Sequence, residues 1–257
     1  MIQLKNKSQI AIMREAGRIT GEALLLGGEA VKPGVSTKQI DAIIRQHIER
    51  CGAKPSFLGY GGFPASACIS VNEQVIHGIP SSKVILKEGD IVSIDVGAYY
   101  KGYHGDSART FAVGKISEDA ARLIDITEKC FWAGVGQIKP DARIGDLGHA
   151  IETLATASGY GVVRRYVGHG VGQNLHESPD VPNYGTAGRG ARVCPGMTIA
   201  VEPMICIGSG EVRELPDGWT VKTADGKLSA HFENTVALTE NGLIILTEVE
   251  HDNFIPR

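Results

Sequence analysis

The chain contains an internal repeat whose two copies stand a constant 107 residues apart. The segment VKPGVSTKQIDAIIRQHIERCG begins at Val31, and IKPDARIGDLGHAIETLATASG begins at Ile138. Each copy opens with Lys-Pro, continues with apolar residues at helical spacing, and closes on a glycine, Gly52 or Gly159. Proline before and glycine after an amphipathic run are typical helix boundaries. Each copy is therefore predicted to be a turn followed by a helix.

The same offset connects two later segments, KEGDIVSIDV and CPGMTIAVEP. It places Gly89 on Gly196 and Asp95 on Glu202. Both segments have the pattern of a glycine turn and then an apolar strand with one acidic residue inside it. A single offset that holds for two different elements indicates a duplicated unit rather than chance similarity.

The repeat predicts an α+β fold in one domain, residues 1–257, with related halves of roughly 1–115 and 116–250. A further helix is expected before each copy, at about residues 8–30 and 117–137. Ser117 is a suitable N-cap for the second of these. The helices of both halves are expected to pack on antiparallel strands.

Composition excludes several classes of protein. The 257 residues can bury a sizeable core, and a net charge of −3 gives no overall basic field for nucleic acid or anionic lipid. The N-terminal residues lack a long apolar stretch, so no signal peptide is expected, and no apolar run approaches the about 20 residues of a membrane span. Five cysteines without a CxxC pair favour reduced thiols in the cytoplasm over a disulfide framework or a zinc knuckle.

Two acidic residues lie close together in the stretch DIVSIDVGAYYKGYHGDSARTF. Asp95 interrupts an apolar run, and Asp106 follows eleven residues later. If Tyr100 and Lys101 form a two-residue hairpin loop, the two aspartates face each other with Cβ atoms about 5 Å apart. Adjacent buried carboxylates need a shared proton, a basic partner or a cation. A single buried acid, however, is as often a structural group held by hydrogen bonds as it is a functional one.

Further candidate ligands follow from the repeat. Glu202 is the repeat mate of Asp95, and Glu233, in HFENT, corresponds to Asp106 if about 20 residues, such as the DGWTVKTADGK loop, are inserted in the second half. His169 lies between two glycines, where the backbone can approach closely. Four carboxylates and one histidine, with no matching cluster of Lys or Arg, favour two cations such as Mn²⁺, Fe²⁺ or Co²⁺ held about 3.5–4 Å apart.

These motifs resemble a known family. GHGVGQNLHE, IDVG followed by Asp106, VEP and HFENT are together similar to the pita-bread metallopeptidases over essentially the whole chain. CISVNEQVIHGIP narrows the resemblance to the methionine aminopeptidases, and the short step from Glu202 to Glu233 resembles type I members. No N-terminal zinc-binding or creatinase-like domain is expected, which favours the bacterial form.

The resemblance implies a role for each matching residue. Asp95 is expected to bind one metal, Asp106 and Glu233 to bridge two, and His169 and Glu202 to bind the second. His77 and His176 match histidines that contact the substrate and the developing oxyanion, and Glu202 matches the group that transfers the proton of the water. The residues that match the methionine pocket are Tyr60, Phe63, Cys68 and Trp219, with Phe57 and Leu175 standing where the family commonly has Cys and Phe.

The implied reaction is removal of N-terminal methionine from nascent chains whose second residue is small, by water activated with two divalent ions (Co²⁺, Mn²⁺, Fe²⁺ or Zn²⁺). We expect a cytoplasmic monomer without a membrane segment or nucleic-acid specificity, and a contact with the ribosome is left open. Of the other histidines, His231 is predicted to lie behind the ligands, and His104 and His251 to be exposed.

Two alternatives use the same fold. A non-catalytic binding module is one, although such members usually lack the ligands. An Xaa-Pro peptidase or dipeptidase is the other, and it would use the same metals. Hydrolysis of Met-Ala-Ser against Ala-Pro-Ala separates the peptidases, and absence of turnover after Mn²⁺ or Co²⁺ addition would support the binding module.

Overall fold

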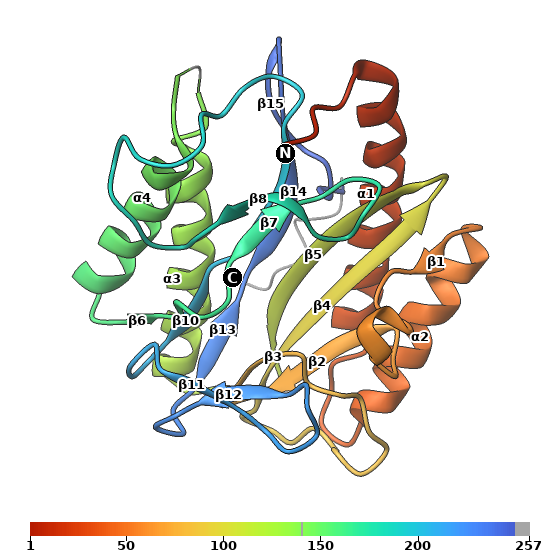
Figure 1. Cartoon of the computed structure of the whole chain (residues 1–257). Coiled ribbons are helices and arrows are strands. Elements are labelled where there is room, and N and C mark those ends of the chain that lie inside the picture. The colour runs from red at the N-terminus through yellow and green to blue at the C-terminus, as the bar shows by residue number, and fades with distance from the viewer. Residues whose placement is uncertain (140, 250–257) are drawn as a thin grey trace.

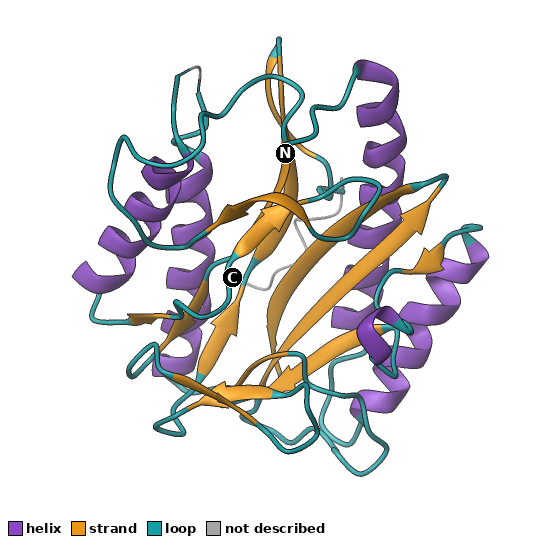
Figure 2. Cartoon of the chain, in the orientation of Figure 1, coloured by secondary structure: helices purple, strands orange, loops and turns teal. Residues whose placement is uncertain are grey.

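A computed structural model describes residues 1–139 and 141–249 of the chain. Strands fill the middle of the molecule, one pair of helices lies on each side of them, and the N- and C-terminal halves occupy opposite sides (Figure 1). Figure 2 shows the same division by secondary structure. The described α-helices are α1 (Lys7–Glu29), α2 (Thr37–Arg50), α3 (Glu118–Val135) and α4 (Ile144–Ala157). The expected α+β arrangement of helices against an antiparallel sheet is confirmed.

Side-chain caps explain where three of these helices begin. Asn6 and Ser36 accept hydrogen bonds from the backbone N–H of Gln9 and Gln39, and each glutamine side chain bonds back to the cap residue. Such reciprocal capping satisfies two backbone donors that a helix start leaves unpaired. Ser117 caps α3 as predicted. The observed bounds of α1 and α3 agree with the predicted ones to within two residues.

The main sheet is antiparallel, with strand order β1-β4-β5-β14-β9-β7-β8, while β2 also pairs with β4 and β15 with β14. Two three-stranded sheets, β13-β10-β6 and β11-β12-β3, flank it. The strands of the main sheet are β1 (Lys54–Pro55), β2 (Ala67–Val71), β4 (Ile91–Tyr100), β5 (Tyr103–Ala112), β7 (Gly168–Gly170), β8 (Glu177–Val181), β9 (Thr198–Val201), β14 (Glu233–Thr239) and β15 (Gly242–Ile245). The others are β3 (Gln74–Ile76), β6 (Gly161–Val162), β10 (Met204–Cys206), β11 (Val212–Glu214), β12 (Val221–Thr223) and β13 (Ser229–His231).

The repeat is visible in matching elements. Helices α2 and α4 both have 14 residues and begin 107 positions apart, as do β1 and β6. Gly52 and Gly159 both have positive φ, 71° and 84°, and Gly89 and Gly196 both have φ 91°. Positive φ is a conformation that glycine adopts without a steric penalty, which explains the shared residue type. The division of the domain near residue 115 stays a prediction, and Pro140 lies outside the described residues.

The register of the β4–β5 hairpin differs from the predicted one. Tyr100 pairs with Tyr103, so the loop is Lys101-Gly102, with φ of 46° and 91°, and not Tyr100-Lys101. Two positive φ values define the turn that suits a two-residue hairpin, and glycine provides the second at no cost. Asp106 consequently faces Gly97 rather than Asp95. A shift of two residues keeps both aspartates on one face of the hairpin, as diagonal neighbours.

The hydrophobic core has one large cluster on each side. Residues of α1 and α2 pack against β2 and β4, and residues of α3 and α4 pack against β9, β10 and β14. Helix α1 crosses the β4–β5 hairpin closely, because a Cβ on Gly105 would lie only 2.8 Å from the Cα of Gly17. The helices therefore hold the acidic hairpin in a fixed place.

Candidate metal centre and adjoining pocket

Four carboxylates come together from four strand segments. Asp95 lies on β4, Asp106 on β5 and Glu233 at the start of β14, while Glu202 directly follows β9. Strand β14 brings the two halves together, because it pairs with β5 through Glu233 and Ala108 and with β9 on its other side. Asp106, Glu202 and Glu233 are buried, and Asp95 is half-buried.

His169 from β7 joins this group. Its Nε2 lies 3.6 Å from Oε1 of Glu202 and 3.8 Å from Oδ2 of Asp106. One ligand atom each of Asp106, His169 and Glu233 lie within 4.8 Å of one another. The Nδ1 atom of His169 lies 2.9 Å from the carbonyl oxygen of Gly170, to which it can donate. That contact leaves Nε2 free of hydrogen and able to coordinate a cation.

The crowding of acids perturbs their protonation. Burial raises the pKa of Asp95 to about 7 and that of Glu202 to about 8. Burial and the neighbouring carboxylates raise the pKa values of Asp106 and Glu233 well above their ordinary range. Burial lowers the pKa of His169 to about 3, so its imidazole is neutral. Carboxylates that cannot all ionise without a counter-charge are suited to divalent cations, which replace the protons.

Unpartnered atoms support the same interpretation. Oδ1 of Asp95 and Oδ1 of Asp106 are buried and have no hydrogen-bond partner among the described residues. Buried polar atoms without partners are rare unless an ion or water completes them. Oxygen ligands with one imidazole are the donor set of hard to borderline divalent ions. The residues present therefore fit the divalent metal ions expected from the sequence.

An apolar pocket adjoins the acids. Phe57, Phe63, Cys68 and Leu175 form one buried cluster, with Trp219 packed against it, and this cluster contains five of the six predicted pocket residues. Cys68 on β2 pairs directly with Asp95, which joins the pocket wall to the acidic hairpin. A Cβ on Gly97 would lie 2.9 Å from Cε1 of Phe57, so that glycine leaves room for the ring.

The sixth predicted pocket residue, Tyr60, contacts a candidate catalytic histidine. Its hydroxyl lies 2.8 Å from Nδ1 of His176, whose ring centroid is 4.1 Å from that of His169. His77 lies at the other side of the pocket, with its ring 6.3 Å from that of Trp219. Burial lowers the pKa of both histidines, that of His77 to about 4. Neutral imidazoles can donate or accept hydrogen bonds at a reacting amide.

The hairpin formed by β11 and β12 places Trp219 at the apolar pocket. It lies within the segment in which an insertion was predicted, and β12 pairs with β3, the strand that ends just before His77. His77 has φ 58°. A non-glycine residue in this region carries strain, and such strain is concentrated at functional sites.

Of the other histidines, one was predicted wrongly. His104 is not exposed as predicted: its Nδ1 lies 2.8 Å from Oγ of Ser56, and its ring packs on Tyr99. His104 lies within β5, and its side chain is half-buried. His231 is buried behind the acids as predicted, with Nε2 3.6 Å from Oε2 of Glu202. His251 lies outside the described residues.

The profile of metallopeptidase family M24 matches residues 11–240. A methionine aminopeptidase of Clostridium acetobutylicum is 52% identical over 250 residues, which cover 97% of this chain and 100% of that protein. The crystal structure of methionine aminopeptidase from Thermotoga maritima has a TM-score of 0.95 and 43% identity, covering 97% of this chain and 100% of that one.

A more distantly related protein shares the same architecture. Prolidase from Pyrococcus furiosus has a TM-score of 0.77 at 27% identity, and the alignment covers 96% of this chain and 66% of the prolidase. The common architecture confirms the pita-bread fold expected from the sequence. The alignment covers the whole of the Thermotoga aminopeptidase but only 66% of the prolidase, which favours a methionine aminopeptidase over an Xaa-Pro peptidase.

Proposed function

The chain belongs to metallopeptidase family M24, and on that premise we propose that it removes the N-terminal methionine from polypeptides whose second residue is small. The observation that carries this proposal is the contact between an acidic cluster and an apolar pocket, made where Cys68 pairs with Asp95. Such a pocket accepts one apolar side chain and leaves the adjoining peptide bond at the acids. The enzyme is a hydrolase that uses divalent metal.

Two ions, Co²⁺, Mn²⁺, Fe²⁺ or Zn²⁺, are the cofactors that we propose. Asp95 would hold one ion, His169 and Glu202 the other, and Asp106 and Glu233 would bridge them. Divalent ions in such a site polarise a carbonyl and lower the pKa of a water. Support comes from the buried and unpartnered Oδ1 atoms of the two aspartates.

The pocket would take the methionine side chain. Phe63 and Trp219 contact each other edge to face, with ring centroids 5.1 Å apart. A thioether makes favourable contacts with the edges of aromatic rings, and an unbranched side chain fits an irregular apolar space. Leu175 and Phe57 keep the wall apolar, and both are buried.

The remaining roles fall to three side chains. Glu202, which is buried beside His169, would accept a proton from the attacking water and return it to the leaving amine nitrogen. If the hydroxyl of Tyr60 donates to Nδ1 of His176, Nε2 of that histidine keeps its hydrogen and can donate it to the developing oxyanion. His77 would bond the scissile amide nitrogen.

Asp106→Asn tests the assignment of the acids. We expect the variant to lose metal-dependent release of Met from Met-Gly-Met-Met, because a bridging ligand contributes to both ion sites, and to be less active than Asp95→Asn. Asp125→Asn, on the exposed face of α3, is the matched control and should remain active. Undiminished turnover by the folded Asp106→Asn protein would refute the assignment of the metal ligands.

Peptide choice tests the substrate class. Met-Ala-Ser should be cleaved and Ala-Pro-Ala should not, and Met-Phe-Ser should be a poor substrate. The opposite preference would favour an Xaa-Pro peptidase. No turnover of any of the three after Mn²⁺ or Co²⁺ addition would favour a binding module.

We also propose a compartment and an oligomeric state for the protein. We place the protein in the cytoplasm as a monomer that acts on nascent chains. No helix in the described part of the chain has the length and hydropathy needed to cross a membrane. A ribosome contact would need basic groups other than the arginines of α1, because Arg14 donates to the carbonyl of Leu246 and Arg18 pairs with Glu15.

A further inference from the structure

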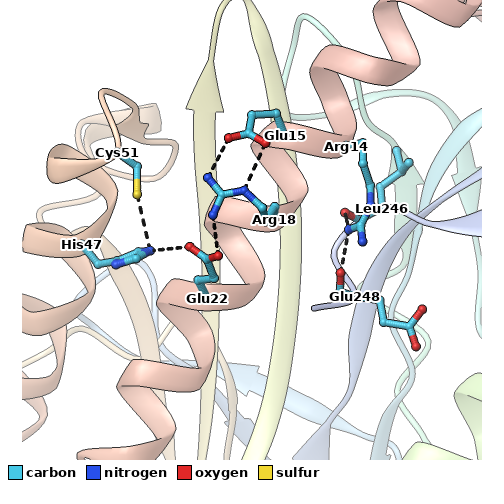
Figure 3. Close-up of polar contacts among 8 residues, drawn as sticks. All are labelled: Arg14, Glu15, Arg18, Glu22, His47, Cys51, Leu246 and Glu248. Carbon is cyan, nitrogen blue, oxygen red and sulfur yellow. Dashed lines mark hydrogen bonds and ion pairs between the residues drawn. The ribbon is translucent and has the colours of Figure 1, made fainter. Parts of the chain in front are cut away.

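A second cluster of metal-binding side chains lies between helices α1 and α2, apart from the acidic strands. Glu22 of α1 faces His47 of α2, and Cys51 caps the end of α2 (Figure 3). His47 and Cys51 are four residues apart, which places them on one face of the helix. This cluster could not be predicted from the sequence, because Glu22 is distant from the other two residues along the chain.

The separations match those of a small tetrahedral site. Nε2 of His47 lies 3.2 Å from Oε2 of Glu22 and 3.6 Å from Sγ of Cys51. Zinc bonds of about 2.0–2.1 Å to nitrogen or oxygen and 2.3 Å to sulfur place neighbouring tetrahedral ligands roughly 3.3–3.6 Å apart. All three candidate ligand atoms lie within 4.8 Å of one another. An ion could therefore be bound with little movement of the helices.

The surroundings hold Glu22 in position. Arg18 donates to Oε1 of Glu22, while its other nitrogens bond the carboxylate of Glu15 at 2.6 and 3.1 Å. That arrangement leaves Oε2 facing His47, as Figure 3 shows. The charges also balance, because a thiolate and a carboxylate match a divalent ion while Arg18 and Glu15 neutralise each other.

Access to the cluster is open. The side chains of Glu22 and His47 are 34% and 21% exposed, so an ion can enter from solvent and a water can complete its coordination. Sulfur, nitrogen and oxygen together favour Zn²⁺ over Mg²⁺, Ca²⁺ or Mn²⁺.

We propose that Glu22, His47 and Cys51 bind one Zn²⁺ ion between α1 and α2. The ion forms a bond to Sγ of Cys51 as the thiol loses its proton to solvent. The site lies outside the catalytic machinery and does not depend on the proposed function. Because α1 also packs on the β4–β5 hairpin, the ion would connect α2 to the helix that supports Asp95 and Asp106.

Cobalt absorption distinguishes this site from the acidic centre. A thiolate bound to Co²⁺ gives an intense near-ultraviolet charge-transfer band, which carboxylate and imidazole ligands do not give. Titration of the full chain with Co²⁺ should produce this band, and the band should saturate when one ion per chain is bound beyond those held by the acidic centre; Zn²⁺ should abolish it. A chain in which the three side chains form only a hydrogen-bonded group would show no band, and that result would overturn the proposal.

Variants assign the band to its ligands. Cys51→Ser should lose the band and bind one ion fewer per chain, while Cys194→Ser, at a half-buried cysteine outside both sites, should keep both. In Glu22→Gln the band should reach half of its maximum at a higher Co²⁺ concentration. This variant tests the site if Cys51→Ser does not fold. A band that persists in Cys51→Ser, or that disappears in Cys68→Ser instead, would overturn the proposal.

Discussion

The ion pair of Lys5 and Glu177 connects the N-terminal segment to the loop that carries His176. Nζ of Lys5 lies 2.5 Å from Oε2 of Glu177, and the two side chains are only 4% and 3% exposed. Lys5 also donates from Nζ to the carbonyl of Gln3 and from its backbone N–H to the carbonyl of Gly196. Removal of one charged group of this pair is expected to destabilise the protein far more than loss of a surface ion pair.

Lys5→Met keeps most of the apolar stem and removes the ammonium group. Removing one partner of a buried pair costs about 3–5 kcal/mol, because the other charge stays buried and unpaired. Here Oε1 of Glu177 still accepts from the backbone N–H of Asn174, so one carboxylate oxygen keeps its partner. We therefore expect the lower end, about 3 kcal/mol, out of the about 5–15 kcal/mol that stabilise a domain.

Urea unfolding at a fixed metal concentration measures this loss. With a denaturant slope of about 3 kcal/mol per M, a loss of about 3 kcal/mol lowers the urea midpoint by about 1 M. Lys7→Met is the matched control, because Lys7 pairs with Glu240 at 3.6 Å with both side chains largely exposed. Exposed pairs contribute little, so its midpoint should not move.

The double variant Lys5→Met/Glu177→Gln completes the cycle. Replacing the carboxylate by a neutral amide removes the unpaired charge, so part of the lost stability should return. An equal midpoint for Lys5→Met and Lys7→Met would refute the reasoning. So would a double variant as unstable as the sum of the two single variants, because it would show that the two groups do not interact.

Three other predictions concern the acids, the pocket and His77. In chelated protein, burial raises the pKa of Asp95 to about 7 and of Glu202 to about 8, so the folded chain holds protons that the unfolded chain has lost. Above about pH 7 most histidines are neutral in both states, and the melting temperature should therefore fall between about pH 7 and 8, less steeply when metal is bound; a rise would contradict this. Trp219→Ala should raise KM for Met-Ala-Ser about 2–12-fold with little change in kcat, because an aromatic contact of about 0.5–1.5 kcal/mol with Phe63 is lost; steady-state kinetics decide. His77→Gly relieves the positive φ and should leave stability equal or up to about 1 kcal/mol higher, while kcat/KM falls about 100-fold or more; urea unfolding and kinetics on one preparation test both.

Sequence alone predicted the features that depend on local pattern. The offset of the repeat located α2 and α4, and the cap residue Ser117 located the start of α3. Asp95 was recognised because it interrupts an apolar strand, where a carboxylate is costly, and Glu202 because it is the repeat mate of Asp95. A pattern of this kind depends on residues that are close together in the sequence, so it can be recognised without a structure.

The features that the sequence did not provide depend on backbone conformation or on contacts between distant segments. The hairpin loop was set by the positive φ of Lys101, which a residue other than glycine or asparagine seldom adopts. His104 was misplaced because its partner Ser56 is distant along the chain. The approach of Glu22 to His47 depends on how α1 and α2 pack, and neither helix shows it by its own periodicity.

The two halves of the repeat differ in the backbone that follows the corresponding acids, Asp95 and Glu202. Strand β4 continues beyond Asp95, whereas the chain after Glu202 meets Pro203, which cannot donate to a ladder. The pairing nevertheless resumes in the same register, because Val201 faces Asn234 on one side of the break and Met204 faces His231 on the other.

In that common register Glu202 and Glu233 fall opposite each other at the break itself. Oε1 of Glu202 lies 3.6 Å from Nε2 of His169, and Glu233 has a ligand atom within 4.8 Å of those of Asp106 and His169. In the first half the unbroken strand β4 instead pairs with β2, and this pairing places Cys68 of the apolar pocket beside Asp95. The duplicated unit thus provides two pairs of acids, Asp95 with Asp106 and Glu202 with Glu233, and the pairing of β14 with β5 and β9 brings them together.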